Sequence, residues 1–335
     1  GLTDLAAVGV LRRGGDATRA VLVLAAGTVA TLLVGRALGW NMFALLQALA
    51  WAIFLHGPLV LAIAAASTRR ALPGVFAAAV ALVGVDAFFV EPRWLEVTTA
   101  RLPGPALRVA LVADLQTDHV GDHERAALAA VRDARPDLVL FAGDYLQIRD
   151  DAVYAREAAA LNAALRETVG RIAPRLGAYA VRGDVDRDTW PALFEGTGVT
   201  PVPETRTFDL DGLSLTALAP RDAPAARALV PARDGFHVVL SHRPDYALTR
   251  PDADLLAAGH THGGQVRLPG IGPLMTLSAV PRAWAAGVTA LPWGGHLVVA
   301  RGIGMERYDA PRLRFLCRPE LVILELGSPE IRAER

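Results

Sequence analysis

The stretch LLAAGHTHGGQ (residues 255–265) begins as a short apolar run and ends in a loop that carries His260 and His262. Similar runs precede it along the chain: LRVALVADL, DLVLFAGD, GAYAVRGD, TRTFDL, LSLTALA and HVVLSHR. Helix-like, alanine-rich segments lie between some of these runs, among them HERAALAAVRDA and DDAVYAREAAALNAALRETV. Strands that alternate with helices indicate an α/β sheet covered on both faces. We therefore predict an α/β fold, in which ligands gather at the carboxyl ends of the strands.

The polar residues at these strand ends belong to a few types, and all of them can bind a metal ion. They are Asp114, Gln116, Asp144, Asp184, Asp186, His242, His260 and His262. A single Asp after a strand often only caps the next helix, but five successive strand ends with such residues favour a metal site. Carboxylate, amide and imidazole ligands together suit Mn²⁺, Fe²⁺, Zn²⁺ or Ni²⁺. Their number fits two ions that share a carboxylate, an arrangement that activates a bridging hydroxide for attack on a phosphoryl group.

Three motifs together resemble those of the calcineurin-like metallophosphoesterases, and among them a membrane-associated bacterial branch whose metal motif ends in GHTHGGQ. AGDYLQ (residues 142–147) matches the family's GD motif, SHRPD (241–245) its single-histidine strand end, and AGHTHGGQVRLPG (258–270) its terminal motif. The resemblance covers roughly residues 107–326. It implies a four-layer α/β fold: a calcineurin-like two-sheet β-sandwich flanked by helices, with the two metal ions on the strand-end loops.

The resemblance also implies which residues hold each ion. Asp114, Gln116, Asp144 and His262 would hold the first ion, and Asp144, Asp184, His242 and His260 would hold the second, so that Asp144 bridges. The family's usual Asp-x-His is here Asp114-Leu115-Gln116. Because an amide oxygen is a harder ligand than an imidazole nitrogen, this change favours Mn²⁺ or Mg²⁺ over Zn²⁺. We expect two divalent ions, Mn²⁺ first, with Fe, Zn, Ni or Mg as alternatives.

The family's usual Gly-Asn-His-Asp is here Gly183-Asp184-Val185-Asp186. Val185 therefore replaces the histidine to which the family assigns phosphate binding or protonation of the leaving group. General acid–base help is worth ~10²–10⁴ in rate, so a loss without replacement would leave a slow enzyme. We predict that His119 replaces it and that Asp118 orients the ring; a solvated loop histidine is the alternative.

Three further residues are candidates for catalytic roles beside the ligands. Arg182 and Arg243 each flank a ligand, where a guanidinium can bind phosphate as a charged fork, and Asp186 belongs to the same motif as Asp184. Surface ion pairs are the competing interpretation of the two arginines.

The first 95 residues predict a membrane region with three transmembrane helices, at about residues 20–38, 42–67 and 71–90. A linker (96–106) and a metallophosphoesterase domain (107–330) follow. Arg12, Arg13 and Arg19 precede the first span, so the positive-inside rule favours an extracytoplasmic domain on a bacterial cytoplasmic membrane. The formal charge is zero, which argues against a nucleic-acid partner. The single Cys317 excludes an internal disulfide and a multi-cysteine zinc site.

An unusually apolar stretch follows the terminal motif, over residues 266–293. Ordinary core packing is the first interpretation of its residues Leu268, Ile271, Leu274, Met275 and Trp284, and an acyl-chain channel or a contact with the bilayer is the alternative. We therefore expect an integral-membrane phosphohydrolase that cleaves a phosphoester or pyrophosphate bond, with a lipid-linked substrate as an inference from the tethering. The competing hypothesis is a catalytically silent membrane protein that keeps the fold for ligand binding or assembly.

Overall fold

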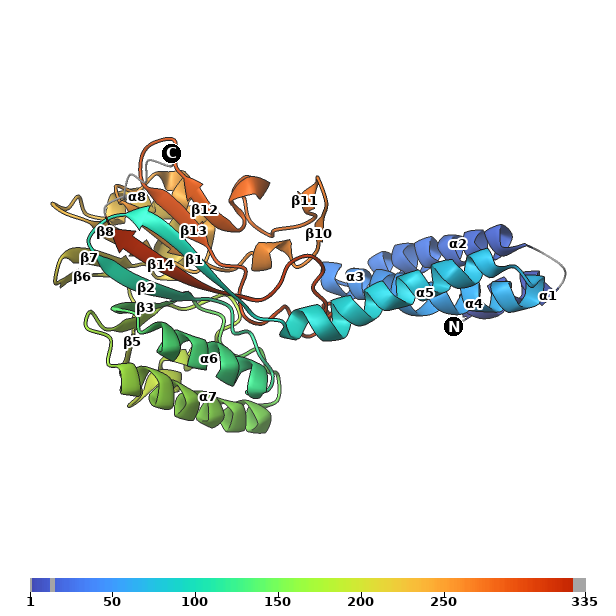
Figure 1. The fold of residues 1–335 in the computed structure, drawn as a ribbon, viewed down its shortest axis with the longest axis horizontal. Helices are drawn as coiled ribbons and strands as arrows, with labels where there is room; N and C mark the ends of the chain where they lie inside the picture. Colours follow the sequence, from blue (N-terminus) through green and yellow to red (C-terminus); the bar gives the residue numbers. More distant parts are fainter. Residues whose placement is uncertain (1, 13–15, 328–335) are drawn as a thin grey trace, which may run out of the picture. The chain divides into compact units, whose positions relative to one another are not determined.

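The computed structural model describes residues 2–12 and 16–327 (Figure 1). The chain divides into two compact units. One comprises Gly1–Val90 with Glu306–Leu313, and the other comprises Glu91–Met305 with Arg314–Arg335. The end of the expected domain, residues 328–330, lies outside the described residues.

The first unit is helical. Its elements are α1 (Leu2–Arg12), α2 (Ala17–Ala37), α3 (Met42–Trp51), the π-helical η1 (Ala52–His56), α4 (Gly57–Thr68), α5 (Ala71–Val85) and the π-helical η2 (Asp86–Val90). Three continuous helical stretches are long and apolar enough to cross a membrane: Ala17–Ala37, Met42–Thr68 and Ala71–Arg93. They coincide with the three expected spans. Helix α1 was not expected, and it packs on α2 and α4 through Ala7 and Leu11.

The second unit contains two six-stranded sheets and one short hairpin. The first sheet has the order β1-β14-β2-β3-β4-β5, formed by β1 (Glu96–Pro103), β14 (Glu320–Gly327), β2 (Leu107–Val112), β3 (Leu138–Phe141), β4 (Ala178–Ala180) and β5 (Val199–Pro201). The second has the order β12-β13-β9-β8-β7-β6, formed by β12 (Gly287–Ala290), β13 (His296–Val299), β9 (Leu255–Ala258), β8 (His237–Leu240), β7 (Leu213–Ala217) and β6 (Arg206–Leu210). The hairpin is β10 (Arg267–Leu268) with β11 (Gly272–Pro273).

Helices complete the layers outside the sheets. They are α6 (Asp122–Ala134), α7 (Asp151–Ile172) and α8 (Ala226–Leu229), with short 3-10 turns η3 (Glu91–Arg93), η4 (Trp190–Phe194), η5 (Pro220–Ala225), η6 (Pro244–Thr249), η7 (His262–Gly264) and η8 (Arg282–Trp284). Figure 1 shows α6 and α7 side by side along the first sheet. In α7, Asp150 caps the first turn by accepting from the Val153 backbone N–H at 2.9 Å.

The core follows the two-residue period of the strands. In β2, Val109 and Leu111 pack between the two sheets, whereas Ala110 and Val112 pack toward α6 and α7. A third cluster covers the outer face of the second sheet, where Leu256 of β9 meets Ala226 of α8. The unit is therefore a two-sheet sandwich flanked by helices, in agreement with the fold class expected from the sequence.

The expected linker differs from the structure. Most of it, Glu96–Pro103, is strand β1, which pairs in parallel with β14 along its whole length. Val97, Thr98 and Thr99 are β-branched and favour an extended strand, and the Thr98 hydroxyl donates to Glu320 Oε1 at 2.6 Å. The partner strand lies more than two hundred residues away in the chain, so the local sequence alone reads as a polar connection.

Candidate metal centre

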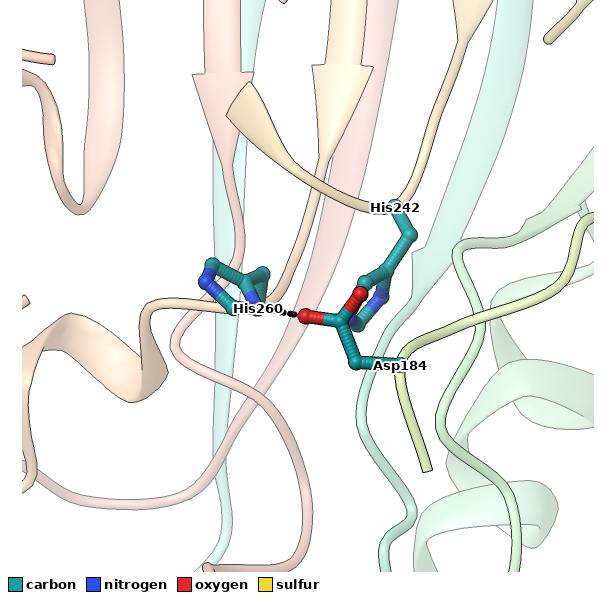
Figure 2. A group of neighbouring side chains, drawn as sticks. All are labelled: Asp184, His242 and His260. Carbon is teal, nitrogen blue, oxygen red and sulfur yellow. Dashed lines mark ion pairs between the residues drawn. The ribbon is translucent and has the colours of Figure 1, made fainter. Parts of the chain in front are cut away.

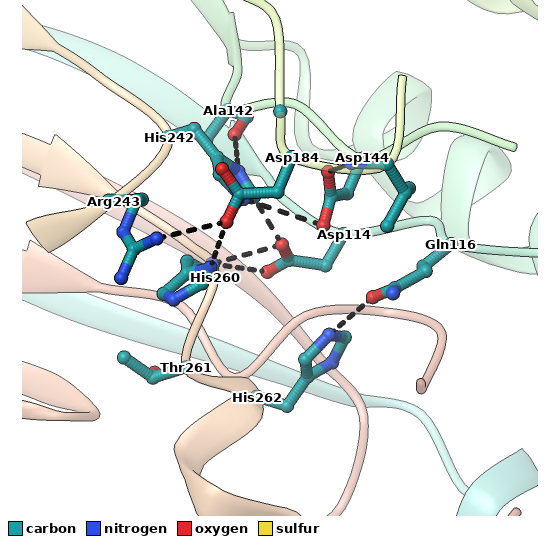
Figure 3. A network of polar contacts seen from close by, with 12 residues as sticks. Asp114, Gln116, Ala142, Asp144, Asp184, His242, Arg243, His260, Thr261 and His262 are labelled. Carbon is teal, nitrogen blue, oxygen red and sulfur yellow. Dashed lines mark hydrogen bonds and ion pairs between the residues drawn. The ribbon is translucent and has the colours of Figure 1, made fainter. Parts of the chain in front are cut away.

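The predicted ligands come from loops that follow β2, β3, β4, β8 and β9, the strands whose carboxyl ends meet at one edge of the sandwich. Figure 3 shows Asp114, Asp144, Asp184, His242 and His260 in one cluster, with Gln116 and His262 beside it. The backbone of five of these residues is left-handed, with φ of 47° at Asp114, 29° at Gln116, 56° at Asp144, 72° at His260 and 48° at His262. Such strain outside glycine typically accumulates at functional sites.

Close packing of the backbone makes this arrangement possible. A Cβ on Gly183 would collide with the Asp144 carboxylate, and a Cβ on Gly259 would lie 2.6 Å from Asp114 Oδ2. Glycine at these two positions therefore lets the neighbouring loops approach the carboxylates.

One group consists of Asp184, His242 and His260, whose ligand atoms all lie within 4.8 Å of one another (Figure 2). Asp184 Oδ2 is 3.1 Å from His260 Nδ1 and 3.8 Å from His242 Nε2. These three residues belong to the set expected for the second ion, and the expected bridge, Asp144, places Oδ2 3.4 Å from His242 Nε2. Burial works to raise the pKa of Asp184, but the hydrogen bond from His260 and the nearby positive charges outweigh it and lower that pKa to about 2.

A second group joins Asp114 and Asp144 to His242, and all three side chains are buried. Burial raises the pKa of Asp114 to about 7 and raises the pKa of Asp144 well above its ordinary value. Two carboxylates in one buried site resist ionising together, and a divalent cation between them would relieve both the desolvation and the repulsion.

Gln116 and His262, expected with the first ion, contact each other directly. Gln116 Oε1 lies 2.5 Å from His262 Nε2, and the Gln116 amide donates to Gln147 Oε1 at 3.2 Å. Behind His262, the Nη2 of the fully buried Arg314 lies 3.4 Å from Nδ1. Nη2 donates to the carbonyl of Arg301 at 2.8 Å, so the guanidinium lies beside Nδ1, whereas Nε2 is on the side of Gln116.

Two of these neighbours were missed in the sequence. Gln147 belongs to the AGDYLQ motif, so the motif itself was a signal that could have found it. Arg314 lies in PRLRFLC, which carries no such signal. Its guanidinium donates to the carbonyls of Arg301 at 2.8 Å and Cys317 at 3.0 Å, so it braces the loop beneath His262.

The orientation of His242 tests whether these residues fit a metal ion. Its Nδ1 is 2.7 Å from the carbonyl of Ala142, which can only accept, so Nδ1 carries the proton. The buried Nε2 has no hydrogen-bond partner among the described residues, and its lone pair faces the carboxylates of Asp144 and Asp184. A lone pair directed at two carboxylates is unfavourable unless a cation lies between the ring and the carboxylates. In addition, a backbone carbonyl that accepts from the other ring nitrogen is typical of histidines that bind metals. The residues therefore fit a metal ion.

Residues 107–264 match the family described as calcineurin-like phosphoesterase. The chain contains a calcineurin-like metallophosphoesterase domain. The chain is similar to metallophosphoesterase YkuE of Bacillus subtilis, with 24% identity over 78% of this chain and 98% of that protein. It is also similar to phosphodiesterase YaeI of Escherichia coli, with 28% identity over 71% of this chain and 90% of that protein. A transmembrane protein with a metallophosphoesterase domain from Danio rerio is 25% identical over 79% of this chain and 64% of that protein.

Asp186 of the metallophosphoesterase domain braces the bridging loop. Its carboxylate accepts three backbone N–H groups, from Gly183 at 2.7 Å, Tyr145 at 2.8 Å and Asp144 at 2.9 Å. Arg182 donates to the Asp186 carbonyl at 2.9 Å and pairs with the exposed Asp188 at 2.8 Å. Through these contacts, Asp186 supports the backbone of the Asp144 loop, and Arg182 supports the backbone of Asp186.

Arg243 lies beside the predicted ligands Asp184 and His260. Its guanidinium is 3.5 Å from Asp184 Oδ2 and donates to the carbonyl of Leu277 at 3.0 Å. The same carbonyl oxygen is 3.0 Å from His260 Nε2. The backbone of Leu277 therefore contacts both Arg243 and the predicted ligand His260. The Nε of Arg243 lies 3.6 Å from Asp245 Oδ2, and the side chain is 42% exposed.

Val185 contacts the site through its backbone, because its N–H donates to Asp144 Oδ1 at 2.9 Å. His119 lies on the loop between Gln116 and α6, with 75% of its side chain exposed. Its Nδ1 is 3.3 Å from Oε2 of the buried Glu157 on α7, so the ring is paired with Glu157, whereas Asp118 was the expected partner. A hydrogen bond from the Val120 backbone N–H lowers the pKa of Glu157 and keeps it ionised beside the ring.

Proposed function

We propose that this chain is a membrane-anchored, two-metal phosphohydrolase that cleaves a phosphoester or pyrophosphate bond. The observation that carries the proposal is the Nε2 lone pair of His242, which faces Asp144 and Asp184 in a family of phosphoesterases. The phosphodiesterase named among the relatives supports hydrolysis of a phosphodiester.

Two ions would be held as the family pattern implies. Asp114, Gln116, Asp144 and His262 would bind the first, and Asp144, Asp184, His242 and His260 the second. When bound, two such ions act as Lewis acids that lower the pKa of water and neutralise charge on phosphoryl oxygens. Gln116 makes one ligand set richer in oxygen, which favours Mn²⁺.

The other polar residues would bind the substrate and move a proton. Arg243, which is 42% exposed, would turn its guanidinium from the long contacts with Asp184 and Asp245 to a phosphoryl oxygen. His119 would protonate the leaving group from Nε2, while Glu157 orients the ring through Nδ1. Asp186 and Arg182 would act as positioning residues, through the backbone of the Asp144 loop.

The three candidate spans support a substrate that is also held in the bilayer, namely a lipid-linked phosphoester or pyrophosphate. The arginines before the first span favour a phosphoesterase domain on the extracytoplasmic side of a bacterial cytoplasmic membrane. A fusion-accessibility assay at the carboxy terminus tests this side. Protease protection in intact spheroplasts would contradict it.

Val185 favours a second candidate function. Its side chain can neither bind phosphate nor give a proton, so the domain would keep the fold and the ions for ligand binding or assembly.

Hydrolysis of bis(p-nitrophenyl) phosphate separates the two functions. The full-length chain with Mn²⁺ should hydrolyse this diester and contain metal by elemental analysis. Asp144→Asn should reduce both, activity by at least about 100-fold, because even the outer neighbours of metal ligands are worth ~10–100-fold. Asp211→Asn, at a side chain that is 87% exposed and pairs with the surface residue Arg175, should leave both unchanged. Bound metal without hydrolysis under any divalent ion would favour the silent protein.

A further inference from the structure

Four large aliphatic side chains are exposed around the β10–β11 hairpin and the strand-like segment beside it. Ile271 is 61% exposed, Leu274 48%, Leu277 43% and Leu316 53%; we call these four residues the apolar rim. Single exposed aliphatic residues are normal on protein surfaces. An exposed group of them along one segment typically marks a contact with a membrane, a ligand or another protein.

The hairpin is joined to the segment that carries Leu316. The backbone N–H of Arg267 donates to the Phe315 carbonyl at 2.9 Å, and the N–H of Phe315 donates to the Gln265 carbonyl at 2.9 Å. Leu274 in turn donates to the Val266 carbonyl at 3.2 Å. The segments that carry the members of the rim are therefore hydrogen-bonded neighbours in the domain.

The same segment is bound to the end of the third candidate span. That span, Ala71–Arg93, ends in η3, where the buried Glu91 accepts from the backbone N–H groups of Leu316, at 2.8 Å, and Cys317. Glu91, Leu316 and the hairpin all belong to the second unit. Leu316, a member of the apolar rim, is thus hydrogen-bonded to the residue at which the last turn of the third candidate span begins.

One member of the rim, Leu277, also contacts residues of the metal centre through its backbone. His262 begins η7, which leads directly into the hairpin, and its carbonyl accepts from Cys317 Sγ at 3.3 Å. The carbonyl oxygen of Leu277 accepts a hydrogen bond from Arg243 and lies 3.0 Å from Nε2 of His260. A lipid whose acyl part contacts the rim would thus bring its phosphate to Arg243 and the predicted ligands.

The charge of this stretch fits a lipid surface. Residues 265–290 contain two arginines, Arg267 and Arg282, and no acidic residue. Arginines beside an apolar surface are attracted to anionic headgroups, whereas a soluble acidic or basic partner would need no exposed aliphatic side chains.

We propose that the apolar rim inserts into the headgroup region of the bilayer that anchors the chain, and that the metal centre takes its phosphoester from a lipid without that lipid leaving the membrane. The chemistry rests on the proposed function. The membrane contact does not, and it can be measured separately.

Fluorescence quenching tests the contact in the full-length chain reconstituted in nanodiscs of phosphatidylcholine and phosphatidylglycerol. Ile271→Cys is labelled with an environment-sensitive dye; the native Cys317 is buried and will not compete. Leu229→Cys, at the end of α8 and 43% exposed, is the matched control. Since rim insertion reaches ~5–10 Å into the interface, doxyl-labelled lipids should quench the Ile271 label at least about twofold more than the control label. Equal quenching of the two labels would overturn the proposal.

Hydrolysis provides the second measurement. The double variant Ile271→Ser, Leu274→Ser should lower the ratio of lipid-phosphodiester hydrolysis in nanodiscs to bis(p-nitrophenyl) phosphate hydrolysis at least about tenfold, because both side chains lose their transfer free energy from water to lipid. The control double variant Leu229→Ser, Leu248→Ser should keep the ratio. An unchanged ratio in the rim variant would contradict delivery from the bilayer. Absence of hydrolysis of both substrates by the native chain would instead reject the proposed function, with the quenching result still standing.

Discussion

The side-chain oxygen of Gln116 lies 2.5 Å from Nε2 of His262, although 146 residues separate the two in the chain. Both residues are predicted ligands of the first ion. Because His262 follows the family pattern, we expect the residue at position 116 to set the metal preference of this predicted site.

Gln116→His should therefore change the preference for metals. An imidazole in place of an amide oxygen makes the site softer and should raise the affinity for Zn²⁺ relative to Mn²⁺ by about tenfold or more. Competitive metal loading followed by elemental analysis measures the ratio. The control is Gln147→Glu, which leaves residue 116 in place. An unchanged ratio in Gln116→His would mean that residue 116 does not bind the ion.

Arg314 should stabilise both the domain and the position of His262. Arg314→Lys keeps the charge but loses the planar fork that reaches the carbonyls of Arg301 and Cys317. Buried carbonyls left without a donor cost ~1–3 kcal/mol each, so we expect a loss of about 2–5 kcal/mol in the free energy of unfolding. Metal affinity should fall about 10–100-fold, as for other neighbours of metal ligands.

Denaturant unfolding and metal titration measure the two effects of Arg314. Arg171→Lys is the control, because that side chain is 64% exposed and forms a surface pair with Glu167. It should change stability by less than about 0.5 kcal/mol. If Arg314→Lys lost stability but bound metal normally, its contact with His262 would have no role in holding the ion.

Val185→His should increase hydrolysis of substrates with poor leaving groups. The backbone N–H of Val185 already donates to Asp144, so an imidazole at position 185 would lie next to the predicted metal ligands. Protonation of the leaving group is worth ~10²–10⁴, so an alkyl phosphodiester should gain about tenfold or more, and a p-nitrophenyl diester much less. The slope of rate against leaving-group pKa is the measurement. Val185→Asn, which adds polarity without a proton donor, is the control, and an equal gain in both variants would refute the explanation.

His119→Ala tests whether this histidine supplies the missing proton. We expect kcat for an alkyl phosphodiester to fall by about 100-fold, with a small change for p-nitrophenyl diesters, whose leaving group needs no proton. Glu157→Gln should also lower kcat for the alkyl phosphodiester more than for p-nitrophenyl diesters, but by a smaller factor. The glutamine would still contact Nδ1 of His119, although without a negative charge. The nearby His123, which lies 3.0 Å from the Ile303 carbonyl, provides the control variant His123→Ala. Full activity of His119→Ala on the alkyl substrate would rule out this role.

Much of the fold could be predicted from local patterns. Apolar runs that end in Asp or His were enough to predict the alternation of strands and helices, the three apolar helices and the strand ends where Asp184, His242 and His260 meet. These features depend on periodicity and on residue type within a few positions, and both can be read along the chain. The same motifs supported the family that residues 107–264 match.

Other relationships required the tertiary structure, because they join segments that are far apart in the chain. Strand β1 was predicted to be a linker, because its partner strand β14 lies far away in the sequence. Asp186 was grouped with the catalytic candidates, yet three backbone N–H groups hold it behind Asp144. The partner of His119 is Glu157 on α7, and the residue behind His262 is Arg314.

The sequence by itself determined which ligand types stand at the strand ends and which stretches are apolar enough to enter a membrane. Only the tertiary structure decided which buried polar group satisfies which other, and that Leu316 is hydrogen-bonded to Glu91. The reason is physical. Secondary structure follows from contacts a few residues apart, whereas a hydrogen bond or an exposed apolar surface exists only after distant segments have packed together.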